Sequence, residues 1–520
     1  MAISYDLIIR GASVIDGVLS PAFAADVGVK DGIIHKVGDL SRAEANRIIE
    51  AKNSFLSPGF IDIHSHSDFS LLINPRAESK VRQGVTTEVI GNCGSSAAPL
   101  FGAKLKRVRE QVEELDVNWK TLKEYRSRLE EGGVAVNVVP LTGQGNLRAA
   151  VVGYDERKPT REEMINMISL LERSLEDGSW GISTGLVYPP GVYSGFEELL
   201  GLISPVAQSG AIYATHMRNE SDRVDEAVGE AVALAEQSGV SLQISHLKAQ
   251  GKANWHLLDE CIRRIEEARG KGLNVHCDRY PYTASSTDLD ILLPEWVFQG
   301  GIAEELKRLA DPGLREKIKE GVTWEDWEAV VISRVSSEAN KVFEGEKLAA
   351  LAAKKKLSPP DCLIELLLEE KTKVEALFFS LSPDNLARVL GLPYCMAGSD
   401  ASAKADYGPL SRGKPHPRAF GTFPRFLSRW ADRGLLSWEE AVHRITGLPA
   451  EKLCLADRGV IKEGAAADLV VFKSDEIRDR ATYEEPQLYP EGIEYMIVNG
   501  EIVIEKGDHT GRLPGRFLVK

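Results

Sequence analysis

The sequence predicts an α/β protein in which a (β/α)8 TIM barrel is joined to a small β-sandwich domain and carries an inserted lid subdomain. Three features indicate this fold. Short β-branched runs alternate with helix-like segments through the middle of the chain. The two ends of the chain share a β-rich texture with glycine-rich turns. A segment of about a hundred residues interrupts the alternation before its last strand.

Length and composition limit the classes of protein that need to be considered. The 520 residues include 77 acidic and 63 basic ones, and no basic run with interleaved aromatic residues is present, so we expect no nucleic-acid partner. The first residues lack the pattern of a secretory signal, and no run of about eighteen apolar residues occurs. We therefore expect a cytoplasmic protein that makes no contact with membranes.

The small β domain is predicted from residues 1–57 and 450–520. The first part contains "YDLIIRGASVIDG" and "ADVGVKDGIIHKVGD", in which D-G turns separate apolar stretches. The second part contains "GVIKEGAAADLVVF" and "GIEYMIVNGEIVIEKGD", where Asn499-Gly500 is a typical hairpin turn between alternating runs. Because the two parts resemble each other in texture, we expect them to form one domain.

The barrel is predicted from residues 58–449. Helical segments separate eight strand-like runs: "GFIDIH", "TTEVIGN", "VAVNVVPL", "WGISTGL", "AIYATH", "LQISHL", "LNVHCD" and "YCMAGSD". Buried parallel strands that alternate with helices are typical of a (β/α)8 barrel, whose chemistry lies at the carboxyl ends of the strands.

An insertion at about 285–390 separates the seventh and eighth runs. It contains helical text and two apolar pieces, "AVVISRV" and "ALFFSLS", either of which could instead be a barrel strand. We predict that the insertion forms a lid subdomain over the mouth of the barrel.

His64 and His66 stand at the end of the first run. Side chains two apart on a strand point to the same face, so the pair could converge on one metal ion. Taken alone, the pair could equally be two hydrogen-bonded polar residues.

Other strand ends carry similar residues. Cys93 follows the second run, His216 the fifth, His246 the sixth and Asp400 the eighth. A barrel would bring these positions to one rim, and imidazole, thiolate and carboxylate groups together suit zinc. The competing interpretations are a packed thiol at Cys93 and a helix cap at Asp400.

A metal ion beside a carboxylate predicts that the protein is a hydrolase. A metal ion lowers the pKa of a bound water towards about 7, which makes that water a nucleophile at neutral pH. We expect Asp400 to take the proton of this water and deliver it to a leaving amine.

The remaining polar residues near strand ends concern the substrate. Lys248, Tyr282 and Arg418 could hold a carboxylate through charge-assisted hydrogen bonds, although the two cations could also be solvated surface residues. Tyr188 and Tyr193 lie in "GLVYPPGVYS", which we interpret as a rigid loop over the site, and we count them as substrate-contacting candidates.

At these motifs the chain resembles the amidohydrolase superfamily, and within it the D-aminoacylases, or N-acyl-D-amino-acid deacylases. The similarity spans essentially the whole length and is carried by "PGFIDIHSHSD", "GNCGSS", "GISTGLVYPPGVYS", "YATHMRNES", "ISHLKAQG", "DRYPYTA", "GSDAS", "HPRAFGTFPR" and "GVIKEGAAADLVVF". The resemblance implies an amidohydrolase-type barrel with a small β domain built from both termini.

The resemblance also implies roles for individual residues. It implies zinc held tightly by Cys93, His216 and His246, with His64 and His66 at a weaker or second metal position. It implies Asp400 as general base and acid, and Lys248, Tyr282 and Arg418 around the substrate carboxylate. The stretch "ASAKADYGPLSRGKP" is longer than expected for the family, which makes Arg412 a rival of Arg418.

The expected substrates are N-acyl derivatives of neutral or hydrophobic D-amino acids. The stretch "TASSTDLDILLPEWVFQGG" after Tyr282 offers no Arg or Lys for a second carboxylate, and its Leu, Ile, Trp and Phe residues suggest an apolar pocket. We expect no partner other than this small molecule and leave open whether the chain forms a homo-oligomer.

Three alternatives remain. A cyclic amidase of the hydantoinase or dihydroorotase type is disfavoured because "GISTGL" lacks a metal-bridging lysine, and a dipeptidase is a further possibility. A non-catalytic scaffold with the same fold should have lost ligands, whereas all six candidate positions are filled.

Overall fold

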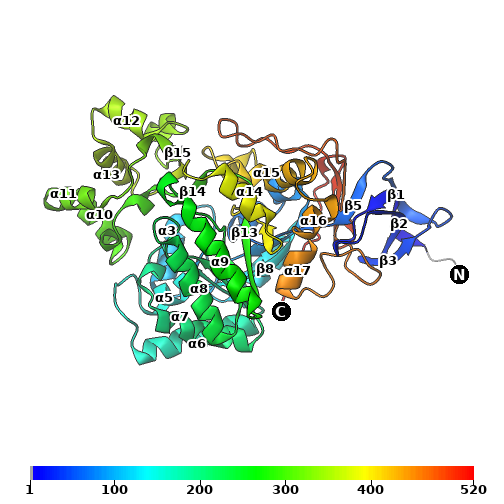
Figure 1. The fold of residues 1–520 in the computed structure, drawn as a ribbon, viewed down its shortest axis with the longest axis horizontal. Helices are drawn as coiled ribbons and strands as arrows, with labels where there is room; N and C mark the ends of the chain where they lie inside the picture. Colours follow the sequence, from blue (N-terminus) through cyan, green and yellow to red (C-terminus); the bar gives the residue numbers. More distant parts are fainter. Residues whose placement is uncertain (1–3) are drawn as a thin grey trace.

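A computed structural model of the protein describes residues 4–520. Figure 1 shows three parts, with the strands of the N-terminus at the right, the barrel in the centre and the insertion at the upper left. Within residues 4–520, no helix has both the length and the apolar character needed to cross a lipid bilayer.

Strands from both ends of the chain form one nine-stranded sheet, as predicted. β18 pairs antiparallel with β5, so that Leu469 lies opposite Pro58, and β5 pairs parallel with β1. Alternate residues of β1, such as Leu7 and Ile9, are buried against Val471 and other apolar side chains of the C-terminal strands. The strands are β1 (Tyr5–Val14), β2 (Phe23–Lys30), β3 (Ile33–Gly38), β4 (Ala45–Glu50), β5 (Phe55–Pro58), β18 (Leu469–Phe472), β19 (Ile493–Val498), β20 (Glu501–Glu505) and β21 (Asp508–His509).

Each of the eight runs predicted for the barrel contains a strand, and the six hydrogen-bonded pairs among these strands are all parallel. A two-residue strand, β9 (Thr142–Gly143), follows the third run and pairs with the fourth. The eight strands are β6 (Phe60–Asp62), β7 (Val85–Ile90), β8 (Asn137–Pro140), β10 (Gly181–Gly185), β11 (Ile212–His216), β12 (Ser241–Ile244), β13 (Val275–Arg279) and β17 (Cys395–Ala397). Together with β9 they form two sheets, β6-β7-β8 and β9-β10-β11-β12-β13-β17.

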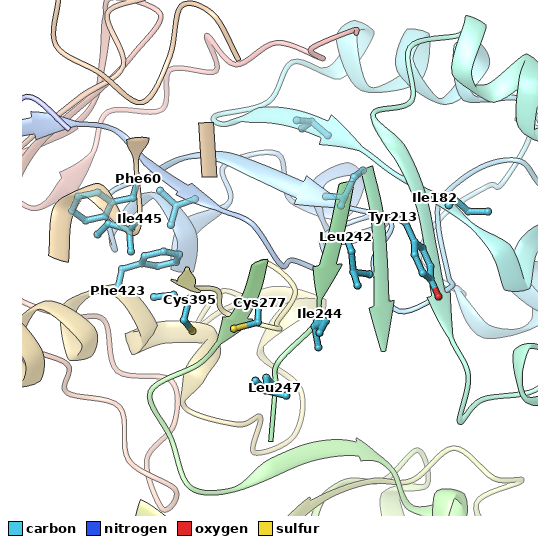
Figure 2. Close-up of a cluster of buried hydrophobic side chains, with 14 of the residues drawn as sticks. Phe60, Ile182, Tyr213, Leu242, Ile244, Leu247, Cys277, Cys395, Phe423 and Ile445 are labelled. Atoms are coloured by element: carbon cyan, nitrogen blue, oxygen red, sulfur yellow. The ribbon is translucent and has the colours of Figure 1, made fainter. Parts of the chain in front are cut away.

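Two apolar layers hold these strands. The interior of the barrel is filled by side chains such as Ile61, Val139 and Met396. The opposite faces of the strands pack against the surrounding helices, and Figure 2 shows Leu242 and Tyr213 in this outer layer. The helices are α1 (Ser70–Ile73), α2 (Glu78–Val81), α3 (Gly102–Gln111), α4 (Leu122–Gly132), α5 (Gln144–Val151), α6 (Arg161–Glu176), α7 (Phe196–Gln208), α8 (Val224–Ser238), α9 (Leu258–Gly270), α14 (Pro383–Gly391), α15 (Arg418–Phe426), α16 (Trp438–His443) and α17 (Gly447–Leu453).

The insertion has its own sheet and its own core. "AVVISRV" and "ALFFSLS" form β15 (Val330–Arg334) and β16 (Glu375–Phe378), which pair antiparallel with each other, and β14 (Ser285–Asp288) pairs with β16. These two pieces are therefore not barrel strands. Helices α10 (Ile302–Ala310), α11 (Pro312–Gly321), α12 (Leu348–Lys355) and α13 (Pro359–Glu369) complete the insertion (Figure 1).

Within residues 4–520, no ladder of backbone hydrogen bonds joins the first and last barrel strands, β6 and β17. Side chains connect them instead. The Ser399 amide donates to Asp62 Oδ1 at 2.9 Å. Lys80 Nζ donates to Asp62 Oδ2 and to Ser399 Oγ, each at 2.7 Å, and lies 3.3 Å from Glu88 Oε2. Burial disfavours the charge of Lys80, but Asp62 and Glu88 outweigh burial and raise its pKa.

We predict that Lys80→Met lowers the free energy of unfolding by about 3 to 5 kcal/mol, because it leaves two buried carboxylates without their cation. Urea denaturation followed by circular dichroism measures this loss. Lys354→Met is the matched control, since Lys354 pairs with Glu346 at the surface and should contribute little. Equal stability of the two variants would contradict a structural role for Lys80.

Candidate metal centre

Donor atoms from five strand ends meet at the rim of the barrel. His64, Cys93, His246 and Asp400 each offer one ligand atom, and these atoms all lie within 4.8 Å of one another. His216 joins this cluster through His246 and Glu220, which form a second group with it. The cluster is buried except for partial exposure of Cys93.

The two histidines of "HSH" are not placed by strand alternation, because β6 ends at Asp62. His64 is held instead by Asp278, whose Oδ1 lies 3.0 Å from His64 Nδ1. His66 lies at the edge of the cluster, with its Nε2 3.0 Å from Asp400 Oδ1. His64 Nε2 also lies 3.4 Å from Asp400 Oδ1, so both histidines of the loop that follows the strand contact Asp400.

Three residues of the cluster have left-handed backbone conformations. The φ angles are 51° at Cys93, 36° at His246 and 51° at Asp400. Such angles cost free energy for residues other than glycine and are concentrated at functional sites. The neighbouring Gly94 is required, since a Cβ there would lie 2.5 Å from the Gly185 amide nitrogen.

Electrostatics favour the ionised forms of the thiol and the carboxylates. Burial opposes ionisation of Cys93, but His64 and the other imidazoles outweigh it and hold the Cys93 pKa well below its usual range. Arg418 and the histidines likewise outweigh burial and hold the pKa of Asp400 well below its usual range. Arg418 Nη1 donates to Asp400 Oδ2 at 2.7 Å.

The donor set fits a zinc ion. His64 Nε2 and His246 Nε2 lie 3.3 and 3.5 Å from Cys93 Sγ, so three donors face one another. The other ring nitrogens of these histidines meet carboxylates, Asp278 for His64 and Glu220 for His246 at 2.9 Å. This is the usual second partner of a metal-binding histidine. His216 Nδ1 is buried without a hydrogen-bond partner within residues 4–520, which also suits a ligand.

Sequence reasoning missed Glu220 and Asp278. Glu220 lies 2.9 Å from His246 Nδ1 and 3.5 Å from His216 Nε2, so it contacts both imidazoles. Lys248 and the histidines outweigh burial and hold the pKa of Glu220 well below its usual range. Asp278 stands at the carboxyl end of the seventh barrel strand, where the rule that found the other residues would also have found it.

The predicted substrate residues fall into two groups. Lys248 and Arg418 line the same cleft as the metal cluster, as does Tyr188, whose ring lies 5.0 Å from that of His216. Lys248 Nζ donates to Glu220 Oε1 at 2.5 Å. Arg412 pairs with Glu114 at 2.6 Å outside the cleft, so the geometry favours Arg418 over this rival.

Tyr282 and Tyr193 do not line the cleft. Tyr282 is buried, and its hydroxyl donates to the carbonyl of Pro417 at 3.4 Å. Tyr193 donates to the carbonyl of Glu295 at 3.4 Å. Tyr280 lines the cleft in place of Tyr282, its hydroxyl is without a partner within residues 4–520, and Arg418 lies 4.6 Å from the centre of its ring.

The cleft is large, with a volume of about 1470 Å³. One wall is formed by barrel loops and α3, and the other by the insertion, including Asp288 and Phe298. The two walls touch at their margins, where the Gly300 amide donates to the carbonyl of Tyr154 at 3.0 Å and Lys373 pairs with Glu113 at 2.9 Å. A ligand that reaches the metal cluster therefore lies between the barrel and the insertion.

The sequence is similar to that of known proteins over almost its whole length. Residues 396–504 match the family model described as "Amidohydrolase family". The chain is 35% identical to the N-acyl-D-glutamate deacylase of Alcaligenes xylosoxydans xylosoxydans, over 99% of this chain and 96% of that protein. It is 34% identical to the D-aminoacylase of the same organism, over 99% of this chain and 98% of that protein.

A solved structure covers the chain completely. It is the N-acyl-D-glutamate deacylase of Bordetella bronchiseptica complexed with zinc and a phosphonate inhibitor that mimics the tetrahedral intermediate of the reaction. The two structures superpose with a TM-score of 0.85 at 32% sequence identity, and the match covers 100% of each chain. The shared architecture therefore extends over the terminal sheet, the barrel and the insertion.

We predict that the purified protein contains zinc and that Cys93→Ser loses most of it, because a thiolate ligand is replaced by a weakly binding hydroxyl. Inductively coupled plasma mass spectrometry after gel filtration measures the metal. Cys454→Ser is the control, since Cys454 is exposed and belongs neither to the cluster nor to the lining of the cleft, and the zinc content of this variant should equal that of the unaltered protein. Unchanged zinc in Cys93→Ser would rule out Cys93 as a ligand.

Proposed function

The chain belongs to the D-aminoacylase family of metal-dependent amidohydrolases, and on that basis we propose that it hydrolyses the amide bond of N-acyl-D-amino acids with zinc as its cofactor. The products are a free D-amino acid and a carboxylate. The observation that carries this proposal is the cluster of His64, Cys93, His246 and Asp400 at the base of an open cleft that also presents Arg418. Family membership favours linear N-acyl amino acids over the cyclic amides of the alternative interpretation.

The proposed ligands are Cys93, His216 and His246 for a tightly held zinc, with His64 and His66 at a weaker second position. Bound zinc supplies Lewis acidity towards the amide carbonyl and lowers the pKa of a water molecule. Asp278 and Glu220 hold the imidazoles in the orientation that the cluster needs.

Asp400 is the proposed proton carrier. Its carboxylate accepts the proton of the attacking water as the new carbon–oxygen bond forms, and then delivers it to the amide nitrogen as the carbon–nitrogen bond breaks. Arg418, 2.7 Å from Asp400 Oδ2, keeps the carboxylate ionised and oriented before this transfer.

The proposed site for the substrate carboxylate is formed by Arg418, Lys248 and Tyr280. Neighbouring cations support this proposal. Arg279 and Arg418 lie 4.0 and 4.6 Å from the centre of the Tyr280 ring. Together with Lys248 they outweigh burial and lower the pKa of Tyr280. An anion placed among these groups would accept charge-assisted hydrogen bonds, and the unpartnered Tyr280 hydroxyl is available to donate one.

For the amino-acid side chain, we propose neutral or hydrophobic groups over acidic ones. Ile291, Leu292 and Phe298 of the insertion line the cleft, as expected from the apolar stretch that follows Tyr282. The chain is similar both to an N-acyl-D-glutamate deacylase and to a D-aminoacylase, so this proposal rests on the lining of the cleft.

The activity test compares four substrates and one variant. We predict hydrolysis of N-acetyl-D-methionine and N-acetyl-D-leucine, little hydrolysis of N-acetyl-L-methionine, and a lower kcat/KM for N-acetyl-D-glutamate. Asp400→Asn should keep its zinc but lose about 100-fold to 10,000-fold in kcat, because the proton carrier is removed. Released amino acid is measured by chromatography.

Asp479→Asn provides the control, since Asp479 is another carboxylate paired with an arginine, Arg425 at 2.7 Å, but lies outside the cleft. It should retain activity. Near-normal turnover in Asp400→Asn would exclude the assigned role, and a preference for N-acetyl-D-glutamate would refute the proposed side-chain class.

A further inference from the structure

Among the carboxylates on the insertion wall of the cleft are Asp288, Asp290 and Glu305. Resting on the proposed function, we infer that they form a subsite for an organic cation, an ammonium or guanidinium group that the substrate carries at a distance from the scissile amide. The cation can belong to the amino-acid side chain or to the acyl group.

The three carboxylates come from three segments of the insertion and line one cleft. Asp288 ends β14, Asp290 lies in the turn that follows, and Glu305 is on α10 (Figure 1). The subsite and the metal cluster line the same cleft. Between them, the Thr287 hydroxyl, next to Asp288, lies 3.0 Å from the Tyr188 hydroxyl. The ring of Tyr188 lies 5.0 Å from that of His216.

No side-chain partner satisfies these carboxylates within the part of the chain that the structure describes. None of the three forms an ion pair, and none accepts a hydrogen bond from another residue. Glu305 is only 3% exposed, yet its Oε1 is without a partner. Two other carboxylates of the insertion are paired, Glu375 with Arg334 at 3.1 Å and Glu304 with Lys307 at 2.5 Å.

The consequence is that the ionised forms of these carboxylates are disfavoured unless a further cation is present. Burial raises the pKa of Glu305 and that of Asp290 to about 7 each, and in each case another carboxylate raises it further. Asp288 is exposed on the wall of the cleft. A cation that enters this space would offset both the burial of the carboxylates and their mutual repulsion.

The resident cations leave this space open. Arg107 of α3 acts on all three carboxylates but lies over the Tyr154 ring, 5.2 Å from its centre, and makes no ion pair with them within 4 Å. Arg308 is occupied by the carbonyls of Val297 and Gln299, at 2.9 and 2.5 Å.

The shape of the wall suits a cation on an apolar stem. Ile291, Leu292 and Phe298 line the cleft beside the carboxylates and can contact methylene groups while the charged end reaches the oxygens. The volume of about 1470 Å³ also exceeds the roughly 300 to 1,000 Å³ of typical ligand sites, so a substrate longer than N-acetylmethionine fits. The inferred substrate group therefore makes the apolar contact expected above and carries a positive charge at its far end.

Two pairs of substrates, matched in length, test the inference by turnover. Nα-acetyl-D-lysine is compared with N-acetyl-D-norleucine for a cation on the side chain, and N-(6-aminohexanoyl)-D-methionine with N-hexanoyl-D-methionine for a cation on the acyl group. The cationic member should have a kcat/KM at least about tenfold higher in one of the pairs, as expected for a charged hydrogen bond. Glu305→Gln and Asp290→Asn should remove this preference and leave the neutral substrates unchanged.

Glu304→Gln is the matched control, since it makes the same chemical change one residue away on α10, where Glu304 faces solvent and pairs with Lys307. It should keep the preference. Equal turnover within both pairs would overturn the inference, as would a loss in Glu305→Gln that is the same for neutral and cationic substrates.

A binding measurement separates failure of the subsite from failure of the proposed function. Hexylammonium has the stem and the cation but no amide, so isothermal titration of the zinc-loaded protein with it does not depend on turnover. The unaltered protein should bind it at least about tenfold more tightly than Glu305→Gln. Equal or absent binding overturns the subsite, whereas binding without hydrolysis of any N-acyl-D-amino acid overturns only the proposed function.

Discussion

The rest of the site depends on one interaction, the close approach of an ionised Cys93 thiol to the imidazoles of His64 and His246. The two imidazoles are buried and the thiol is partly exposed, and the interaction is favourable only if several charges and hydrogen-bond partners come together. The barrel meets this condition because parallel strands bring distant parts of the chain to one rim. Left-handed backbone at Cys93, His246 and Asp400 then turns the side chains inward, which is a conformational cost that the surrounding fold must support.

A neighbouring set of polar contacts stabilises the barrel between β6 and β17, which no ladder of backbone hydrogen bonds joins within the described part of the chain. Lys80, Asp62 and Ser399 join β6 to the loop after β17, and this loop carries Asp400. The Asp400 amide also donates to the carbonyl of His64 at 2.8 Å. Closure of the barrel and placement of the proposed proton carrier therefore use adjacent residues, so that the position of Asp400 depends directly on packing between the first and last strands.

Much of the fold could be predicted from the sequence, because β-branched runs and helical periodicity are local signals. The alignment of donors at strand ends followed from the barrel rule. The expectations that differ from the structure depended on the residue at which a strand ends and on the direction in which a side chain points. β6 ends before His64, so alternation did not apply, and Tyr280 faces the cleft where Tyr282 was expected. Glu305 lies on a separate helix, and its approach to Asp288 and Asp290 arises only from the tertiary packing of the insertion.

The central claim is that Cys93 and histidines share one zinc ion. Extended X-ray absorption fine structure (EXAFS) spectroscopy at the zinc K-edge of the purified protein tests this claim most directly. A sulfur neighbour at about 2.3 Å together with imidazole nitrogens at about 2.0 to 2.1 Å is the predicted result. A spectrum with imidazole and oxygen neighbours but no sulfur would contradict the claim, because the thiolate around which the cluster is built would then not be a ligand.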